Sequence, residues 1–198
     1  MTPVRRALNP SSTLRDVVRE GLGAVEKAHI KLIDDSIRAA FVDSLDIDAG
    51  FVAQYPNDPR WDYLLGHDAS GQVVGLEPHS AKTGEISTVK AKRAHARAQL
   101  RDHMKPGATV AEWFWVASGK VDFLDQEKAT LQLAQAGVKF IGRRVLQRHL
   151  ASLSTTRNFS PARGTPDRPA ISTGIAGGAS RMRSPLSLVM ERTRPKKS

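Results

Sequence analysis

RWDYLLGHDASGQVVGLEPH, residues 60–79, contains two runs of apolar and aromatic residues on either side of the polar turn Asp68-Ala69-Ser70-Gly71. Strand-forming runs around a short turn that ends in Gly are typical of a β-hairpin. If the turn is centred between Ala69 and Ser70, Asp62 lies directly opposite Glu77. The stretch therefore predicts a hairpin that brings two carboxylates face to face.

This pair of acids needs a partner, because like charges directly opposite on paired strands are destabilising and buried ions are costly to desolvate. A divalent cation, a basic neighbour or a proton on one carboxyl would each satisfy the need. Side chains alternate along a strand, so His79 shares a face with Glu77. Two carboxylates suit Mg²⁺, which takes a few protein oxygens and keeps much of its water.

Hydrophobic periodicity outlines the rest of the chain. The apolar stripe that ends at Leu45 predicts a long helix, and the dense run Glu112-Trp113-Phe114-Trp115-Val116 predicts a strand buried on both faces, with core packing favoured over base stacking for the tryptophans. Crossovers after an antiparallel hairpin predict an α/β (α+β) fold with a mixed β-sheet and flanking helices. The expected elements are a short helix from Thr13, a helix over 25–45, a strand over 50–55, the hairpin, a helix over 85–104, a strand over 109–117, a helix over 122–136 and a strand over 138–142.

The hairpin acids and this order of elements resemble the restriction-endonuclease-like PD-(D/E)XK nuclease superfamily, whose αβββαβ core carries an Asp on one strand and Glu-x-Lys on the next. Asp62 matches the Asp, and Glu77-Pro78-His79 matches Glu-x-Lys, with His79 where the family has Lys. The resemblance covers roughly residues 26 to 146.

The resemblance implies hydrolysis of phosphodiester bonds in DNA. Asp62 and Glu77 would hold Mg²⁺ or Mn²⁺, His79 would orient the attacking water or contact the phosphate, and Lys90, on the next helix, would supply the missing positive charge. A homodimer is compatible with the resemblance, since many members act as dimers. The alternative is a nuclease-like fold without catalysis that binds nucleic acid or protein, which the replacement of Lys by His favours.

Charge also points to nucleic acid. The chain of 198 residues has a net charge of +10, which favours polyanionic partners. Along the helix over 85–104, Arg93, Arg97 and Arg101 follow at helical spacing and form a candidate nucleic-acid-binding stripe. A solvated basic face is the alternative interpretation of the same stripe.

Composition sets the remaining expectations. The sequence has no cysteine, which favours a cytoplasmic protein. Neither a signal peptide nor an apolar run of about 20 residues is present, so no membrane association is expected. A change to Ser, Thr, Pro, Gly and Arg after residue 150 predicts a disordered basic tail. The predicted organisation is an N-terminal arm with a short helix over 1–24, a nuclease-like domain over 25–150 and the tail over 151–198.

Overall fold

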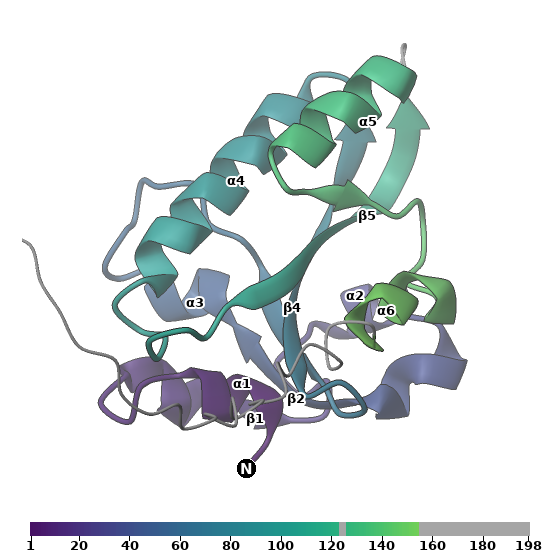
Figure 1. Cartoon of the computed structure of the whole chain (residues 1–198). Coiled ribbons are helices and arrows are strands. Elements are labelled where there is room, and N and C mark those ends of the chain that lie inside the picture. Colours follow the sequence, from purple (N-terminus) through teal and green to yellow (C-terminus); the bar gives the residue numbers. More distant parts are fainter. Residues whose placement is uncertain (123–125, 155–198) are drawn as a thin grey trace, which may run out of the picture. The chain divides into compact units, whose positions relative to one another are not determined.

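The computed structural model describes residues 1–122 and 126–154, and this part of the chain is built around one six-stranded mixed sheet (Figure 1). Neighbouring strands are antiparallel from the first to the fourth and parallel from the fourth to the sixth. The strands, which lie side by side in sequence order, are β1 (Arg19–Glu20), β2 (Phe41–Asp46), β3 (Tyr63–His67), β4 (Gln72–Lys82), β5 (Val110–Asp122) and β6 (Lys139–Phe140). The α+β class and the mixed sheet predicted from the sequence are confirmed.

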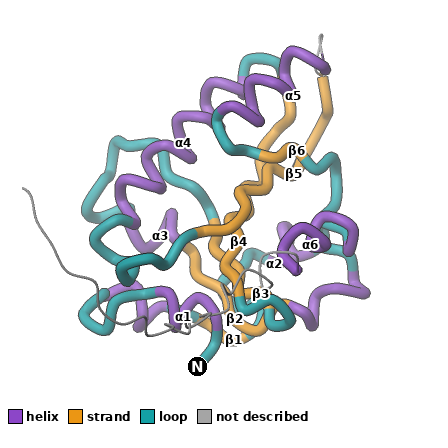
Figure 2. Tube along the Cα trace, in the orientation of Figure 1, coloured by secondary structure: helices purple, strands orange, loops and turns teal. Residues whose placement is uncertain are grey.

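Helices cover both faces of this sheet. Figure 1 shows α3 and α4 on one side of β4 and α2 and α6 on the other, and Figure 2 shows the same strands between helices. The helical segments, two of which are 3-10 helices (η), are α1 (Pro3–Ala7), η1 (Thr13–Val17), α2 (Lys27–Ile30), η2 (Asp35–Ala40), α3 (Ile47–Phe51), α4 (Glu85–Leu100), α5 (Gln126–Gln135) and α6 (Gln147–Ser154).

The core is divided into two layers by the alternation of side chains along the strands. On β5, Trp113 and Trp115 pack into the layer that contains α1, α3, α4 and α5. Phe114 and Val116 pack into the layer that contains η2 and α6. All four side chains are buried, which confirms a strand covered on both faces and the core role of the tryptophans.

The predicted hairpin is confirmed, including its register. His67 pairs with Gln72 and Tyr63 with Leu76, and Gly71 in the turn has a positive φ of 67°. Because β3 starts at Tyr63, the second half of β4 loses its neighbour on that side and pairs only with β5. The predicted acid pair lies at the point where β3 and β4 part.

The predicted helix over 25–45 is wrong. This segment forms the short helices α2 and η2 and then strand β2. A bulge between Phe41 and Asp43 places Phe41 in one core layer and Leu45 in the other. The apolar residues of this segment are spaced like one face of a helix, but the fold divides them between the two faces of the sheet. Their spacing therefore predicted the wrong secondary structure.

The strand expected over 50–55 is also wrong, because its first residues belong to helix α3. Asp46 caps this helix by accepting a hydrogen bond from the Ala49 amide at 2.8 Å. Helices α4 and α5 and strands β5 and β6 confirm the elements predicted from residue 85 onward. Phe123 and Leu124, near the start of the predicted helix over 122–136, lie outside the described residues.

Residues 1–24, expected to start with a loose arm, pack against the sheet. Val4 and Leu8 are buried in the core. The buried carboxylate of Asp43 accepts hydrogen bonds from the backbone amides of Val4 at 3.1 Å and Arg5 at 3.0 Å. These amides belong to the first turn of α1 and have no partner within the helix, so Asp43 fixes α1 on the sheet.

The C-terminal boundary also moves. Helix α6 continues to Ser154 and buries Leu150 and Leu153, so residues 151–154 belong to the folded part rather than to the predicted tail. Residues 155–198, for which disorder was predicted, lie outside the described residues. None of the described helices is long and apolar enough to cross a membrane.

Candidate active site

The two hairpin acids meet as the sequence predicts. Asp62 is the last residue before β3, and its backbone N–H donates to Glu77 Oε2 at 3.1 Å. The Asp62 carbonyl accepts a hydrogen bond from the Ile47 amide at 2.9 Å, which holds the residue against the start of α3. Glu77 lies on β4 and is fully buried. The two residues therefore come together as predicted, although strand pairing ends one step earlier, at Tyr63 and Leu76.

Lys92 bridges the two carboxylates from helix α4. Its ammonium donates to Asp62 Oδ1 at 3.0 Å and to Glu77 Oε1. The side chain of Lys92 is 17% exposed, that of Asp62 20% and that of Glu77 0%. Two carboxylates and one ammonium give the cluster a formal charge of −1 in a place that is largely shielded from water. We call these three residues the acid–lysine triad.

The triad perturbs its own proton affinities. Burial, with the nearby Asp62 carboxylate, raises the pKa of Glu77 well above its ordinary value, although the Lys92 ammonium acts in the opposite direction. Burial lowers the pKa of Lys92, but the Glu77 and Asp62 carboxylates outweigh it and raise that pKa overall. Lys92 therefore stays charged, and Glu77 gains a proton more readily than an ordinary glutamate.

His79 lies beside the triad and is held by a second acid. Its Nδ1 is 3.6 Å from Glu77 Oε1, and its Nε2 is 3.0 Å from Glu85 Oε2 at the start of α4. The hydrogen bond with His79 lowers the pKa of Glu85. Asp62, Glu77 and His79 thus gather at one place, as predicted, with Glu85 as an additional member that the sequence did not suggest.

Lys92, and not the predicted Lys90, is the lysine of α4 that contacts the two acids. The two residues are about 200° apart around α4, and in the described part of the chain Lys90 makes no ion pair with either acid. A signal for Lys92 is present in the sequence. The apolar stripe Ile86, Val89, Ala96 and Leu100 lacks a member near position 92 or 93, and a charged residue at a buried helical position usually has a partner.

The donor set partly fits a small divalent cation. One oxygen of each carboxylate converges on the Lys92 ammonium, and the residual charge of −1 is favourable for a cation. Within residues 1–122 and 126–154, however, no group of three or more His, Asp or Glu residues could hold a metal ion. Mg²⁺ is commonly held by one or two carboxylates with water and phosphate completing its shell, which matches the number of acids here.

Arg93, Arg97 and Arg101 lie together, but on the other border of α4. They line a pocket of about 740 Å³ with Trp113 and the loop before β5. None of the triad residues lines it. Arg60, a basic residue close to Asp62 in the sequence, does not pair with Glu77, because its Nε donates to Asp48 Oδ1 at 2.9 Å. The predicted basic stripe is therefore a spatial cluster that is separate from the triad.

Comparisons with known proteins do not extend this description. No protein-family model, no curated protein and no solved structure matches the chain.

Proposed function

We propose that this protein hydrolyses phosphodiester bonds in nucleic acid, with DNA as the favoured substrate, at the acid–lysine triad. One observation carries the proposal: Lys92 contacts both Asp62 and Glu77. The motif that the sequence resembles needs an Asp, a Glu and a Lys, and the chain lacks the Lys at position 79. Helix α4 supplies an ammonium at the place where the strand does not.

The order of elements adds support. Apart from the short helix α3 between β2 and β3, strands β2, β3 and β4, helix α4 and strand β5 follow one another along the chain in a βββαβ order, as the resemblance implies. The acids stand where β3 and β4 part, and α4 packs beside β4. The first helix of the expected αβββαβ core is replaced by the short helices α2 and η2, so the support comes from the five elements that follow it.

Each residue has a defined task in this proposal. Asp62 and Glu77 would hold Mg²⁺ or Mn²⁺, and the bound ion would activate water and offset the charge that develops on the phosphate. Lys92 provides a fixed positive charge and hydrogen-bond donors for a phosphate oxygen. His79, held by Glu85, stands next to Glu77, where it would orient the attacking water or contact the phosphate.

The first experiment is calorimetric titration of Mg²⁺ and Mn²⁺ into the wild type and Asp62→Asn. Saturable binding that the substitution abolishes would place a metal ion at the triad. Cleavage of plasmid DNA is then followed for the wild type, Lys92→Met and Lys90→Met. Loss of one such electrostatic contact usually lowers the rate about 100-fold or more, and we expect this loss for Lys92→Met alone. A rate that falls only in Lys90→Met would refute the assignment of Lys92.

A second candidate function is a binding module with the same fold but no catalysis. The specific observation in its favour is that both Glu77 oxygens already have partners, the Lys92 ammonium and the Asp62 amide. The triad would then be a structural ion cluster. Wild-type protein that binds DNA, takes up no metal and cleaves neither DNA nor RNA with Mg²⁺ or Mn²⁺ would establish this alternative and overturn hydrolysis.

A further inference from the structure

The pocket beside Trp113 gathers positive charge without a counter-charge. Its lining includes Arg93, Arg97, Arg101 and Lys105 and contains no acidic residue. In the described part of the chain none of these four side chains forms an ion pair, and the buried Nε of Arg93 has no hydrogen-bond partner. Several like charges repel one another unless an anion relieves them. The pocket therefore has the electrostatics of an anion-binding site.

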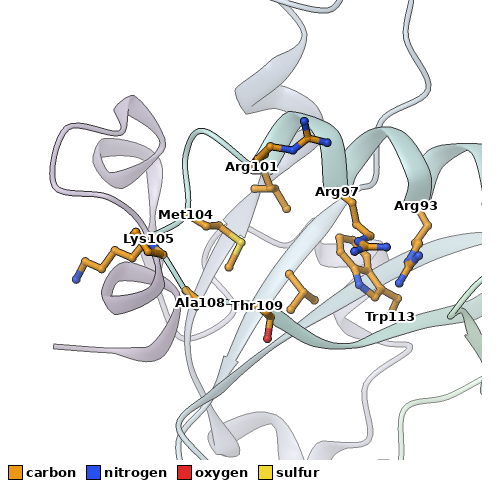
Figure 3. A pocket seen from close by; sticks show the side chains of 12 residues that line it. Arg93, Arg97, Arg101, Met104, Lys105, Ala108, Thr109 and Trp113 are labelled. Atoms are coloured by element: carbon orange, nitrogen blue, oxygen red, sulfur yellow. The ribbon is translucent and has the colours of Figure 1, made fainter. Parts of the chain in front are cut away.

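Arg93 is the most constrained of these cations. Its guanidinium carbon lies 5.8 Å from the centroid of the Trp113 ring, and a Cβ at Gly137 would come within 2.6 Å of its Nη2. Burial and the neighbouring charge of Arg97 lower its pKa. Figure 3 shows Arg93 and Arg97 reaching from α4 toward Trp113. Arg93 is thus held in place before a ligand arrives.

The remaining walls are apolar. Leu100, Met104, Pro106 and Val110 contribute hydrocarbon surface beside the cations, and Thr109 adds a hydroxyl group. A volume of about 740 Å³ is in the range of pockets that hold a whole small molecule. A ligand that suits this lining has a charged end for the arginines and a flat or apolar part for the walls.

We propose that this pocket binds a phosphorylated ligand of nucleotide size. Guanidinium groups match phosphate oxygens in pairs of parallel hydrogen bonds, which favours phosphate as the charged end. The apolar wall offers a contact surface for a base. The same chemistry is present in a free nucleotide and in the phosphorylated end of a strand, so these are two sources of one ligand type.

The site is distinct from the triad and does not depend on hydrolysis there. Lys92 and Arg97 are five residues apart on α4, which separates them by about 140° around the helix. Lys92 contacts the hairpin acids, whereas Arg97 lines the pocket by the start of β5. Loss of cleavage in Lys92→Met would leave this proposal untouched, and loss of ligand binding here would leave the triad untouched.

The test is calorimetry with the full chain at physiological salt, using the four nucleoside 5′-monophosphates and the matching nucleosides. The pocket variant is Arg97→Gln/Arg101→Gln. The control is Arg19→Gln/Arg143→Gln, which removes the same charge at two arginines that are also exposed. We expect saturable binding of at least one monophosphate, at least tenfold weaker binding of its nucleoside and of the pocket variant, and a change under twofold in the control.

Competition then identifies the source of the phosphate. Displacement of a bound monophosphate by a 5′-phosphorylated oligonucleotide, but not by its 5′-hydroxyl form, would assign the pocket to strand ends. Displacement by neither form would assign it to free nucleotides. Absence of saturable monophosphate binding would overturn the proposal, as would equal affinity for nucleoside and nucleotide or an equal loss in the pocket variant and the control.

Discussion

Replacement of Lys92 by Met removes the ammonium group that pairs with Glu77 but keeps most of the hydrocarbon stem. Within the described residues, no other Lys or Arg forms a salt bridge with Glu77. Breaking a buried ion pair by removing one partner costs roughly 3–5 kcal/mol. Lys92 and Asp62 retain partial contact with water, so the lower end applies. We expect Lys92→Met to lower the free energy of unfolding by about 3 kcal/mol near neutral pH.

The loss should depend on pH, with a defined sign. The pKa of Glu77 is raised in the folded state above its ordinary value of 4.5. The folded state therefore holds this proton more tightly than the unfolded state, and stability falls as pH rises above the ordinary value. Removal of Lys92 raises the pKa further, because the ammonium favours the ionised form. The cost of the substitution should thus be smaller near pH 5 than near pH 7.5.

Urea unfolding at both pH values measures the free-energy cost of each substitution. The proteins compared are the wild type, Lys92→Met, Glu77→Gln and the double variant. The double variant has no uncompensated Glu77 charge, so we expect the two effects to be non-additive by at least about 1 kcal/mol. Lys90→Met, which changes the same residue type on the same helix, should change stability by no more than about 0.5 kcal/mol. A cost below about 1 kcal/mol, or one that is equal at both pH values, would refute the account of a buried, charged triad.

Three further predictions concern the scaffold. Gly75→Ala places a Cβ 2.6 Å from the Trp113 ring and should cost about 1–3 kcal/mol in urea unfolding, whereas Gly119→Ala, with no atom near its added Cβ, should be close to neutral. Asp43→Ala leaves two amides of α1 without their acceptor and should expose the N-terminal segment to trypsin, and unchanged digestion would contradict the anchor. Burial lowers the pKa of His67, so the unfolded state binds its proton first and stability should fall as pH drops below about 6.5. If the unfolding free energy of His67→Gln falls with decreasing pH as much as that of the wild type, another group causes the acid sensitivity.

Local patterns were sufficient for some features because their determinants lie close together in the chain. The polar turn with Gly71 sets the hairpin register, and that register alone places Asp62 opposite Glu77. The apolar stripe of α4 and the dense aromatic run of β5 likewise carry their own periodicity. These elements were predicted with the correct type, and the mixed sheet follows from their order.

Long-range packing decided the rest. The apolar residues of 25–45 fit a helical stripe in sequence, but the edge of β3 is paired with β2, and a bulge at Phe41 and Asp43 divides them between two core layers. The N-terminal residues looked like an arm because their anchor, Asp43, lies almost 40 residues away. Neither fact leaves a trace within a local window.

Local sequence patterns are enough to predict that two carboxylates share one hairpin and that a basic helix follows it. Which lysine meets the acids depends instead on the packing of α4 against β4, whose rotation points Lys92 toward them and Lys90 away. The same rotation sends Arg93 and Arg97 to the other border of the helix and separates the basic pocket from the triad. The physical reason is that helical periodicity fixes which residues share a face, whereas packing against the sheet fixes where that face points.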